Sequence, residues 1–139
     1  TGDTGADVIT GRGGADTLTG GSRSDTFVFA TGDTGITEAT ADTITDFSTG
    51  TDKIDVDAPG TYVEADGTNT ADLAAFITNA DASLTTVSDD IYAEYNFAGN
   101  GNTLVVLDEN ASGTVDAGDT LIILTGLSTA GGLDASDFI

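Results

Sequence analysis

Three aspartates stand nine residues apart near the start of the chain, at Asp7, Asp16 and Asp25. Carboxylates held close together repel one another, and a cation between them removes that repulsion. Ca²⁺ suits such a place because it is a hard ion that takes about six to eight oxygen ligands, including main-chain carbonyls. The spacing therefore indicates metal chemistry, with the aspartates as calcium ligands.

Glycines and a large apolar residue keep the same step as the aspartates. The template G-G-x-G-x-D-x-U-x, with U a large apolar residue, is typical of calcium-binding parallel β-helices and β-rolls. Its glycine half forms a tight turn and its x-U-x half a short strand, so Ile9, Leu18 and Phe27 are predicted to form a thin core. The three units read GDTGADVIT (2–10), GRGGADTLT (11–19) and GGSRSDTFV (20–28).

Two other interpretations of this segment are weaker. A flexible tail rich in glycine and aspartate would not require three columns of residues to stay in step. A phosphate-binding glycine loop would need a preceding strand and a G-K-[ST] ending, and the run 11–14 has neither.

The match to the template is imperfect at the glycine positions. Asp3 and Arg12 replace the second glycine of the first two units, and Arg23 replaces the fourth-position glycine of the third. The next nine residues would place Thr34 where an aspartate is expected, with Asp33 one step out of register. We therefore expect the repeats to end here, with one well-formed calcium site and a second, irregular one.

Composition narrows the function further. The chain has 139 residues, enough for one domain, and its 24 acidic and 3 basic residues give a formal net charge of −21. This charge disfavours nucleic acid and anionic membranes, attracts divalent cations, and opposes compaction in the absence of metal. Without cysteine or histidine, the chain offers no disulfide, no zinc site of the usual type and no histidine-based nucleophile pair.

The order of predicted elements is β-rich. Alternating polar and apolar residues are typical of strands, and the nearly continuous apolar runs 104–107 and 121–124 favour central, buried strands. Pro59-Gly60 is predicted to form a turn and Gly99–Asn102 a hairpin loop. The predicted strands cover residues 26–29, 42–47, 52–56, 91–97, 103–107 and 120–124.

One helix is predicted from about residue 70 to residue 80, with Asn69 as its N-cap. Its apolar face is expected to pack on the sheet rather than to bind a partner. The fold class that we predict is all-β with one short helix, in which a short parallel calcium β-roll continues into an antiparallel, β-sandwich-like capping segment. The residues of the apolar face are Leu73, Phe76, Ile77 and Ala80.

A second calcium candidate lies between the last two predicted strands. Counted as twelve residues from Asp108, the loop has oxygen-bearing side chains at the EF-hand positions, with Gly113 sixth and Val115 eighth. It ends in aspartate instead of glutamate, and strands rather than helices flank it, so an opening switch is not expected. A solvated acidic hairpin loop is the alternative. The candidate ligands are Asp108, Asn110, Ser112, Thr114, Asp116 and Asp119.

Together these motifs resemble RTX proteins, which are bacterial products of type I secretion. The run Ala41–Phe47, followed by Gly50 and Asp52–Asp55, resembles the segment after the β-roll of serralysin-type proteases. The ending Leu133–Ile139 is similar to their C-terminal tail, where an acidic residue followed by hydrophobic residues belongs to the export signal. Similar modules also occur on adhesins, surface-layer proteins and lipases.

The resemblance implies a set of calcium ligands. Asp7 and Asp25, two repeats apart, would flank one row of ions, and Asp16 would lie at the opposite edge and use the irregular next turn. Protease chemistry is not implied, because the zinc-binding histidines are absent, so we expect no catalytic residue here. Main-chain oxygens that would complete the site lie near Gly2, Thr4, Gly20 and Ser22.

We therefore expect a non-catalytic, calcium-dependent folding and secretion module at the C-terminus of a larger bacterial protein, which is secreted or on the cell surface. Residues 1–30 would end the β-roll, and residues 31–139 would form a capping and secretion-signal segment packed with it as one unit. The expected partners are calcium ions and, through the tail, the type I secretion apparatus. We expect no nucleic acid, no membrane insertion and a monomeric module.

Three other functions stay open at this stage. Calcium could bridge copies of the chain in a surface layer or adhesin. A glycan-binding β-roll would want basic or exposed aromatic residues, which are scarce here. Paired aspartates could serve a glycosidase, but calcium ligation explains their spacing better.

Overall fold

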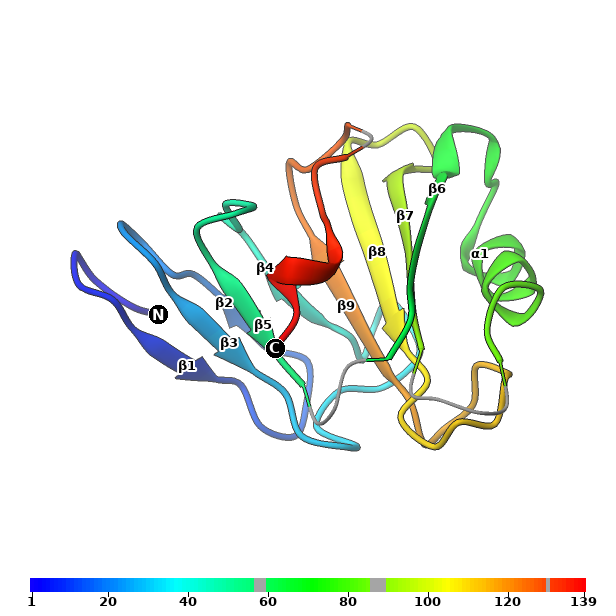
Figure 1. Cartoon of the computed structure of the whole chain (residues 1–139), viewed down its shortest axis with the longest axis horizontal. Helices are drawn as coiled ribbons and strands as arrows, with labels where there is room; N and C mark the ends of the chain where they lie inside the picture. The colour runs from blue at the N-terminus through cyan, green and yellow to red at the C-terminus, as the bar shows by residue number, and fades with distance from the viewer. Residues whose placement is uncertain (57–59, 86–89, 130) are drawn as a thin grey trace.

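The computed structural model describes residues 1–56, 60–85, 90–129 and 131–139, and its strands form two sheets (Figure 1). The three-stranded sheet has the order β1 (Val8–Thr10), β3 (Thr26–Val28) and β5 (Lys53–Asp55). The six-stranded sheet has the order β2 (Thr17–Leu18), β4 (Asp42–Ile44), β9 (Thr120–Leu124), β8 (Asn102–Leu107), β7 (Ile91–Phe97) and β6 (Tyr62–Asp66).

From β1 to β5 the chain crosses between the two sheets at every strand, and each strand pairs in parallel with the strand two steps later. Ile9 lies opposite Phe27, and Phe27 opposite Ile54, so the apolar residue of each unit stacks on the next. Ile9, Leu18 and Phe27 are 8%, 5% and 0% exposed, which confirms the predicted thin core. The parallel pairing continues beyond the sequence repeat, since β4 and β5 pair in the same way although the glycine half of the template does not precede them.

The larger sheet is buried on both faces. Alternate residues of β8 and β9 enter two different cores, as the period of a strand requires. Val105 and Ile122 pack between the two sheets, whereas Leu104 and Leu121 pack beneath helix α1 (Leu73–Asp81). The prediction that the apolar runs 104–107 and 121–124 are central, buried strands is confirmed.

The predicted helix is correct in place but wrong at its start. Asn69 ends a short 3-10 helix (Gly67–Asn69), and the N-cap of α1 is Asp72, whose side chain accepts a hydrogen bond from Ala75 N–H. Phe76 and Ala80 are fully buried, so the predicted apolar face packs on the sheet. Strand β6 was not predicted, and Pro59 lies outside the described residues.

The chain is mostly β with one α-helix, and its strands have mixed orientation. The predicted antiparallel cap is correct for β7, β8 and β9, but β6 pairs in parallel with β7, and β9 pairs in parallel with β4. The cap therefore extends one sheet of the repeats instead of forming a separate sandwich. Across the described ranges, no helix has the length and apolarity needed to cross a membrane.

Candidate cation sites and family membership

The repeat aspartates lie at the turns that lead into the strands. Each stands two residues before the apolar residue of its unit, so in extended chain its carboxylate points to the same side as the core residue. The carboxylate of one coil then accepts a hydrogen bond from the main chain of the coil before it. Asp7 N–H donates to Asp25 Oδ1 at 2.9 Å, and Asp25 N–H donates to Asp52 Oδ1 at 3.0 Å.

We call Asp7, Asp25 and Asp52 the first row. The second row lies at the turns that lead into the other sheet and consists of Asp16 and Asp42. Asp16 N–H donates to Asp42 Oδ1 at 2.8 Å. The structure thus brings the predicted ligands Asp7 and Asp25 together and places Asp16 apart from them, beside Asp42.

In the first row, oxygens converge where a glycine leaves room. A Cβ atom built on Gly2 would meet the carbonyl oxygen of Gly20 and would lie 2.6 Å from Asp7 Oδ2. A Cβ atom on Gly20 would lie 2.5 Å from Asp25 Oδ2. A carbonyl beside a carboxylate is a donor pair that suits Ca²⁺, so these residues fit the ion that the spacing predicts.

The second row contains a buried acidic oxygen that accepts no hydrogen bond from the described residues. Asp42 is 0% exposed, and its Oδ2 has no hydrogen-bond partner among the described residues. A Cβ atom built on Gly11 would lie 2.6 Å from this oxygen and 3.2 Å from Asp16 Oδ2. A buried carboxylate oxygen without a partner is costly, and a cation between the two side chains would compensate it.

The electrostatics of Asp42 agree with this geometry. Burial raises the pKa of Asp42 above its usual range, and the nearby Asp16 and Asp33 carboxylates raise it further, while the hydrogen bond from Asp16 N–H opposes the shift. The site therefore disfavours a bare negative charge on Asp42. Either a proton or a cation relieves it.

The turns keep their shape where glycines are missing. Arg12 and Arg23 adopt φ values of 68° and 88°, a region that favours glycine. Ser22 N–H donates to Asp3 O at 3.1 Å, which joins the third turn to the first. Thr4 lies exposed in the first turn. The third turn, in which Arg23 replaces the template glycine, is thus formed at the cost of backbone strain.

The loop between β8 and β9 gathers around two buried carboxylates. Asp108 accepts hydrogen bonds from Ser112 and Gly113 N–H at 3.0 and 2.7 Å, and it is 0% exposed. Asp119, 1% exposed, accepts from Glu109 and Asp116 N–H at 3.2 and 2.7 Å. The predicted ligands are therefore close together, but here the main-chain N–H groups of the loop occupy the acidic oxygens.

The outer ligands of this loop bond to one another. Asn110 Nδ2 donates to Asp116 Oδ1 at 3.1 Å, and Ser112 Oγ donates to the carbonyl of Thr114 at 2.8 Å. Burial, with the nearby Asp108 and Asp116 carboxylates, raises the pKa of Asp119 to about 6 against the effect of its hydrogen bonds. Calcium binding at this loop stays a prediction.

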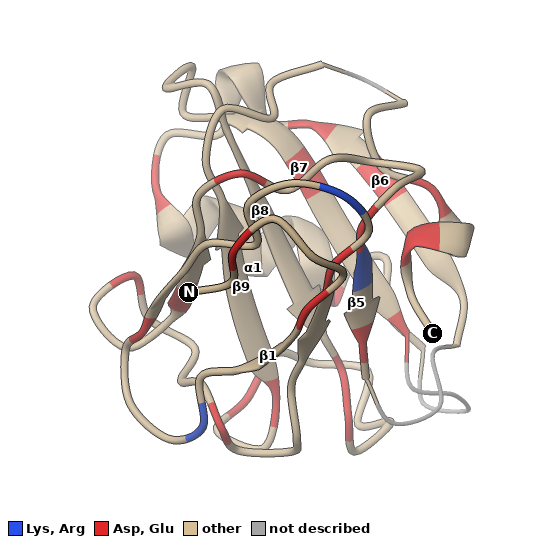
Figure 2. Cartoon of the chain, turned by 90° about the vertical axis from the view of Figure 1, so that its left-hand side faces the viewer, with Lys and Arg blue, Asp and Glu red and all other residues tan. Residues whose placement is uncertain are grey.

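No three acidic side chains in the described part of the chain form a metal-binding cluster by themselves. At each row the available oxygens are a pair of carboxylates and neighbouring main-chain carbonyls. The acidic residues are spread over the turns and strand ends, with few basic ones between them (Figure 2).

A comparison with protein families shows to which family the chain belongs. The family described as peptidase M10 serralysin C terminal matches residues 2–139. The chain belongs to this family. No curated protein matches the chain. The suspected serralysin-type C-terminal module is confirmed, and serralysin-type proteins are secreted proteins of which this part is not the catalytic one.

Three aspartates in or beside the candidate cation sites of this serralysin C-terminal domain were not predicted. Asp42 and Asp52 extend the two rows, and Asp46 accepts hydrogen bonds from Gly20 and Gly21 N–H, both at 2.8 Å. A signal for the first was present, because Asp42-Thr43-Ile44 repeats the Asp-Thr-apolar triplet of the second and third units. This triplet was not recognised as a repeat because the glycine half of the template does not precede it.

Proposed function

We propose that this serralysin C-terminal domain is a calcium-dependent folding and type I secretion module of a larger, extracellular bacterial protein. The observation that carries the proposal is the second row, where the buried and unpartnered Asp42 Oδ2 and the Asp16 carboxylate converge beside Gly11. A folded chain does not keep such an arrangement bare without cost. Membership of the family supports calcium as the ion.

The parallel coil from β1 to β5 is, in this proposal, a calcium β-roll. Asp7, Asp25 and the carbonyl of Gly20 would hold an ion in the first row, with further main-chain oxygens of the turns at Gly2, Thr4 and Ser22. Asp16 and Asp42 would hold an ion in the second row. Bound calcium would supply positive charge at turns that otherwise hold acidic oxygens at close range.

The energetic scale is sufficient to make folding depend on the ion. A ligand that binds only the folded state stabilises it by about 2.7 kcal/mol at a hundredfold excess over its Kd. Two or three such ions would supply roughly 5–8 kcal/mol, compared with a typical total stability of about 5–15 kcal/mol. The formal charge of −21 opposes the compact state until cations are bound.

This dependence suits export. Where free calcium is scarce, the charged chain would stay expanded and could pass through a secretion channel. Outside the cell, where calcium is plentiful, the rows would fill and the chain would fold. The tail at residues 133–139 would carry the export signal, and the domain would be non-catalytic and monomeric.

Circular dichroism of the chain in calcium, in magnesium and in EDTA tests the proposal. We expect a native β spectrum and a cooperative thermal transition in calcium, and loss of both in EDTA. Magnesium is the control, because it demands a smaller octahedral shell and binds poorly to sites rich in carbonyl oxygens. A native spectrum and an unchanged transition in EDTA would show that folding does not need the ion.

A further inference from the structure

The last residues of the chain are built into the core. Phe138 is 4% exposed and Leu133 2% exposed, and both pack in the core between the two sheets. Ile139 N–H donates to the carbonyl of Ile54 at 3.0 Å, and Val56 N–H donates to the carbonyl of Ile139 at 2.9 Å. The segment therefore pairs along the free edge of β5, where the chain ends in Figure 1.

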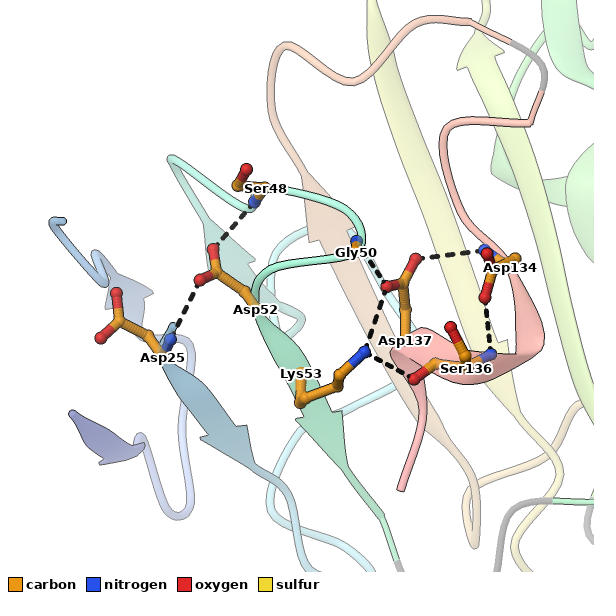
Figure 3. A network of polar contacts seen from close by, with 8 residues as sticks. All are labelled: Asp25, Ser48, Gly50, Asp52, Lys53, Asp134, Ser136 and Asp137. Atoms are coloured by element: carbon orange, nitrogen blue, oxygen red, sulfur yellow. Dashed lines mark hydrogen bonds and ion pairs between the residues drawn. The ribbon is translucent and has the colours of Figure 1, made fainter. Parts of the chain in front are cut away.

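A buried carboxylate fixes this segment in place. Asp137 is 0% exposed, and its Oδ1 accepts a hydrogen bond from Gly50 N–H at 2.8 Å. The same oxygen lies 3.7 Å from Lys53 Nζ, which also donates to the carbonyl of Ser136 at 2.7 Å (Figure 3). Its Oδ2 accepts from Asp134 N–H at 3.1 Å. Lys53–Asp137 is the one ion pair that the described residues form.

One short loop joins this carboxylate to the first row. Asp52 Oδ1 accepts from Asp25 N–H, and Asp52 Oδ2 accepts from Ser48 N–H at 2.8 Å. Two residues before Asp52, Gly50 donates to Asp137, and Lys53 follows Asp52 directly. Figure 3 shows this continuous path from Asp25 through Asp52 and the loop to Asp137. Loop 48–52 therefore contacts the first row through Asp52 and the buried Asp137 carboxylate through Gly50.

We propose that residues 133–139 form a latch whose docking is coupled, through Asp52 and loop 48–52, to cation binding in the first row. The segment docks when the row is filled and is released when the row is empty. The inference rests on the proposed function, and it adds that filling the row hides the segment that carries the export signal. The signal is then accessible to the secretion apparatus only in the calcium-poor chain.

The direction of the coupling follows from charge. Without a cation, the carboxylates of Asp25 and Asp52 repel, and displacement of Asp52 moves the loop that presents Gly50 N–H. Asp137 then loses a donor while it is buried, which favours release of the segment. Coupling of two equilibria is reciprocal, so weakening the latch must also weaken calcium binding.

The test compares two variants that remove one positive charge each, at a residue of the latch and at a residue outside it. Lys53→Met keeps the apolar stem and loses the ion pair, and Arg12→Met is the control because Arg12 is exposed in a repeat turn. Lys53→Arg keeps the charge. Amide exchange of Val56 and Ile139 reports docking, because their N–H groups make the hydrogen bonds between the segment and β5. Calcium titration followed by circular dichroism reports the row.

We expect Lys53→Met to speed exchange of both amides about fivefold at saturating calcium, the size of one partly exposed ion pair with a hydrogen bond. The calcium concentration at the midpoint of its titration should rise about twofold, because the loss of stability is divided among several bound ions. Arg12→Met and Lys53→Arg should stay close to the unmodified chain. In the unmodified chain, protection of Ile139 should increase over the same calcium range as protection of Asp25, and this needs no variant.

Faster exchange with an unchanged calcium midpoint would overturn the coupling, because the segment would then dock independently of the row. If Arg12→Met changes amide exchange and the calcium midpoint as much as Lys53→Met does, the coupling is overturned as well, because the effect is then one of net charge. If Lys53→Met does not fold, the unmodified chain still tests the latch. Amide protection of Ile139 that develops over a different range of calcium concentration from that of Asp25 would contradict it. These failures leave calcium-dependent folding intact, whereas an unmodified chain that does not respond to calcium contradicts the proposed function itself.

Discussion

Replacing Asp42 by asparagine should have opposite effects on stability with and without calcium. In the folded chain, Asp42 Oδ1 accepts a hydrogen bond from Asp16 N–H, whereas Oδ2 has no partner among the described residues. Asparagine keeps the first contact through its carbonyl oxygen and places an amide donor where the bare oxygen was. It also removes a buried negative charge near Asp16. The variant therefore loses a metal ligand but no hydrogen bond.

The geometry bounds the size of the effect. Asp42 Oδ2 and Asp16 Oδ2 lie 2.6 and 3.2 Å from one point beside Gly11, so the two oxygens are at most about 6 Å apart. Two unit charges at about 6 Å repel by roughly 1–3 kcal/mol for effective dielectric constants between those of water and a protein surface. In EDTA we expect the variant to be more stable by about this amount. In calcium, loss of one charged ligand should cost at least about 1.4 kcal/mol, which is a tenfold loss of affinity.

The assay is urea unfolding followed by circular dichroism, at saturating calcium and in EDTA. If the calcium-free chain is mostly unfolded, sucrose added equally to all samples raises the folded fraction. Asp46→Asn is the matched control, because both Asp46 oxygens accept main-chain hydrogen bonds and the change should destabilise under both conditions. If Asp42→Asn destabilises in EDTA as well, the reasoning about the unpartnered oxygen is wrong.

Three further predictions concern the turns and the loop. Arg23→Gly should raise the unfolding free energy in calcium by about 1 kcal/mol, because Arg23 holds a φ of 88°; a loss of stability in thermal unfolding would contradict this. Gly11→Ala should weaken calcium binding at least about tenfold in calorimetry, because its Cβ would lie 2.6 Å from Asp42 Oδ2. Gly13→Ala is its control, since a Cβ there meets nothing within 4 Å. The calcium-free folded state should lose stability as pH rises from about 4 to above 6, because the pKa of Asp119 is about 6 when folded and 3.8 is its ordinary value. The folded state binds the extra proton in that range, so the expected loss between pH 4.5 and pH 7 is about 2 kcal/mol for this residue alone. Urea unfolding in EDTA at pH 4.5 and pH 7, with the same added sucrose at both pH values, measures this, and Asp119→Asn should flatten the profile.

Sequence reasoning succeeded where one residue type is repeated for one physical reason. The core positions Ile9, Leu18 and Phe27 follow from a nine-residue period that is typical of coiled parallel strands. The apolar runs of β8 and β9 are long enough that no half-exposed strand could hold them. In both cases local pattern and tertiary burial require the same answer, so the pattern alone was sufficient.

Elements whose partners are remote were harder to predict. Strand β6 reads Tyr62–Asp66, and with two acidic residues and no buried residue its strand signal is weak. It forms because β7 offers it a free edge in parallel register. The start of α1 was wrong because Asn69, the predicted N-cap, ends the 3-10 helix at residues 67–69, and Asp72 caps α1 instead.

The missed aspartates show what a calcium repeat needs from its sequence. The glycine half of the template matters only where the turn requires positive φ or a close approach of oxygens, and arginine takes such a φ at Arg12 and Arg23. The carboxylate placed two residues before a core residue has no such substitute, because the strand period fixes its direction. Asp42 and Asp52 keep that spacing to Ile44 and Ile54 after the glycines have gone, and both stay within their rows. A search for this domain's cation ligands should therefore start from the aspartate and its core residue rather than from the glycines.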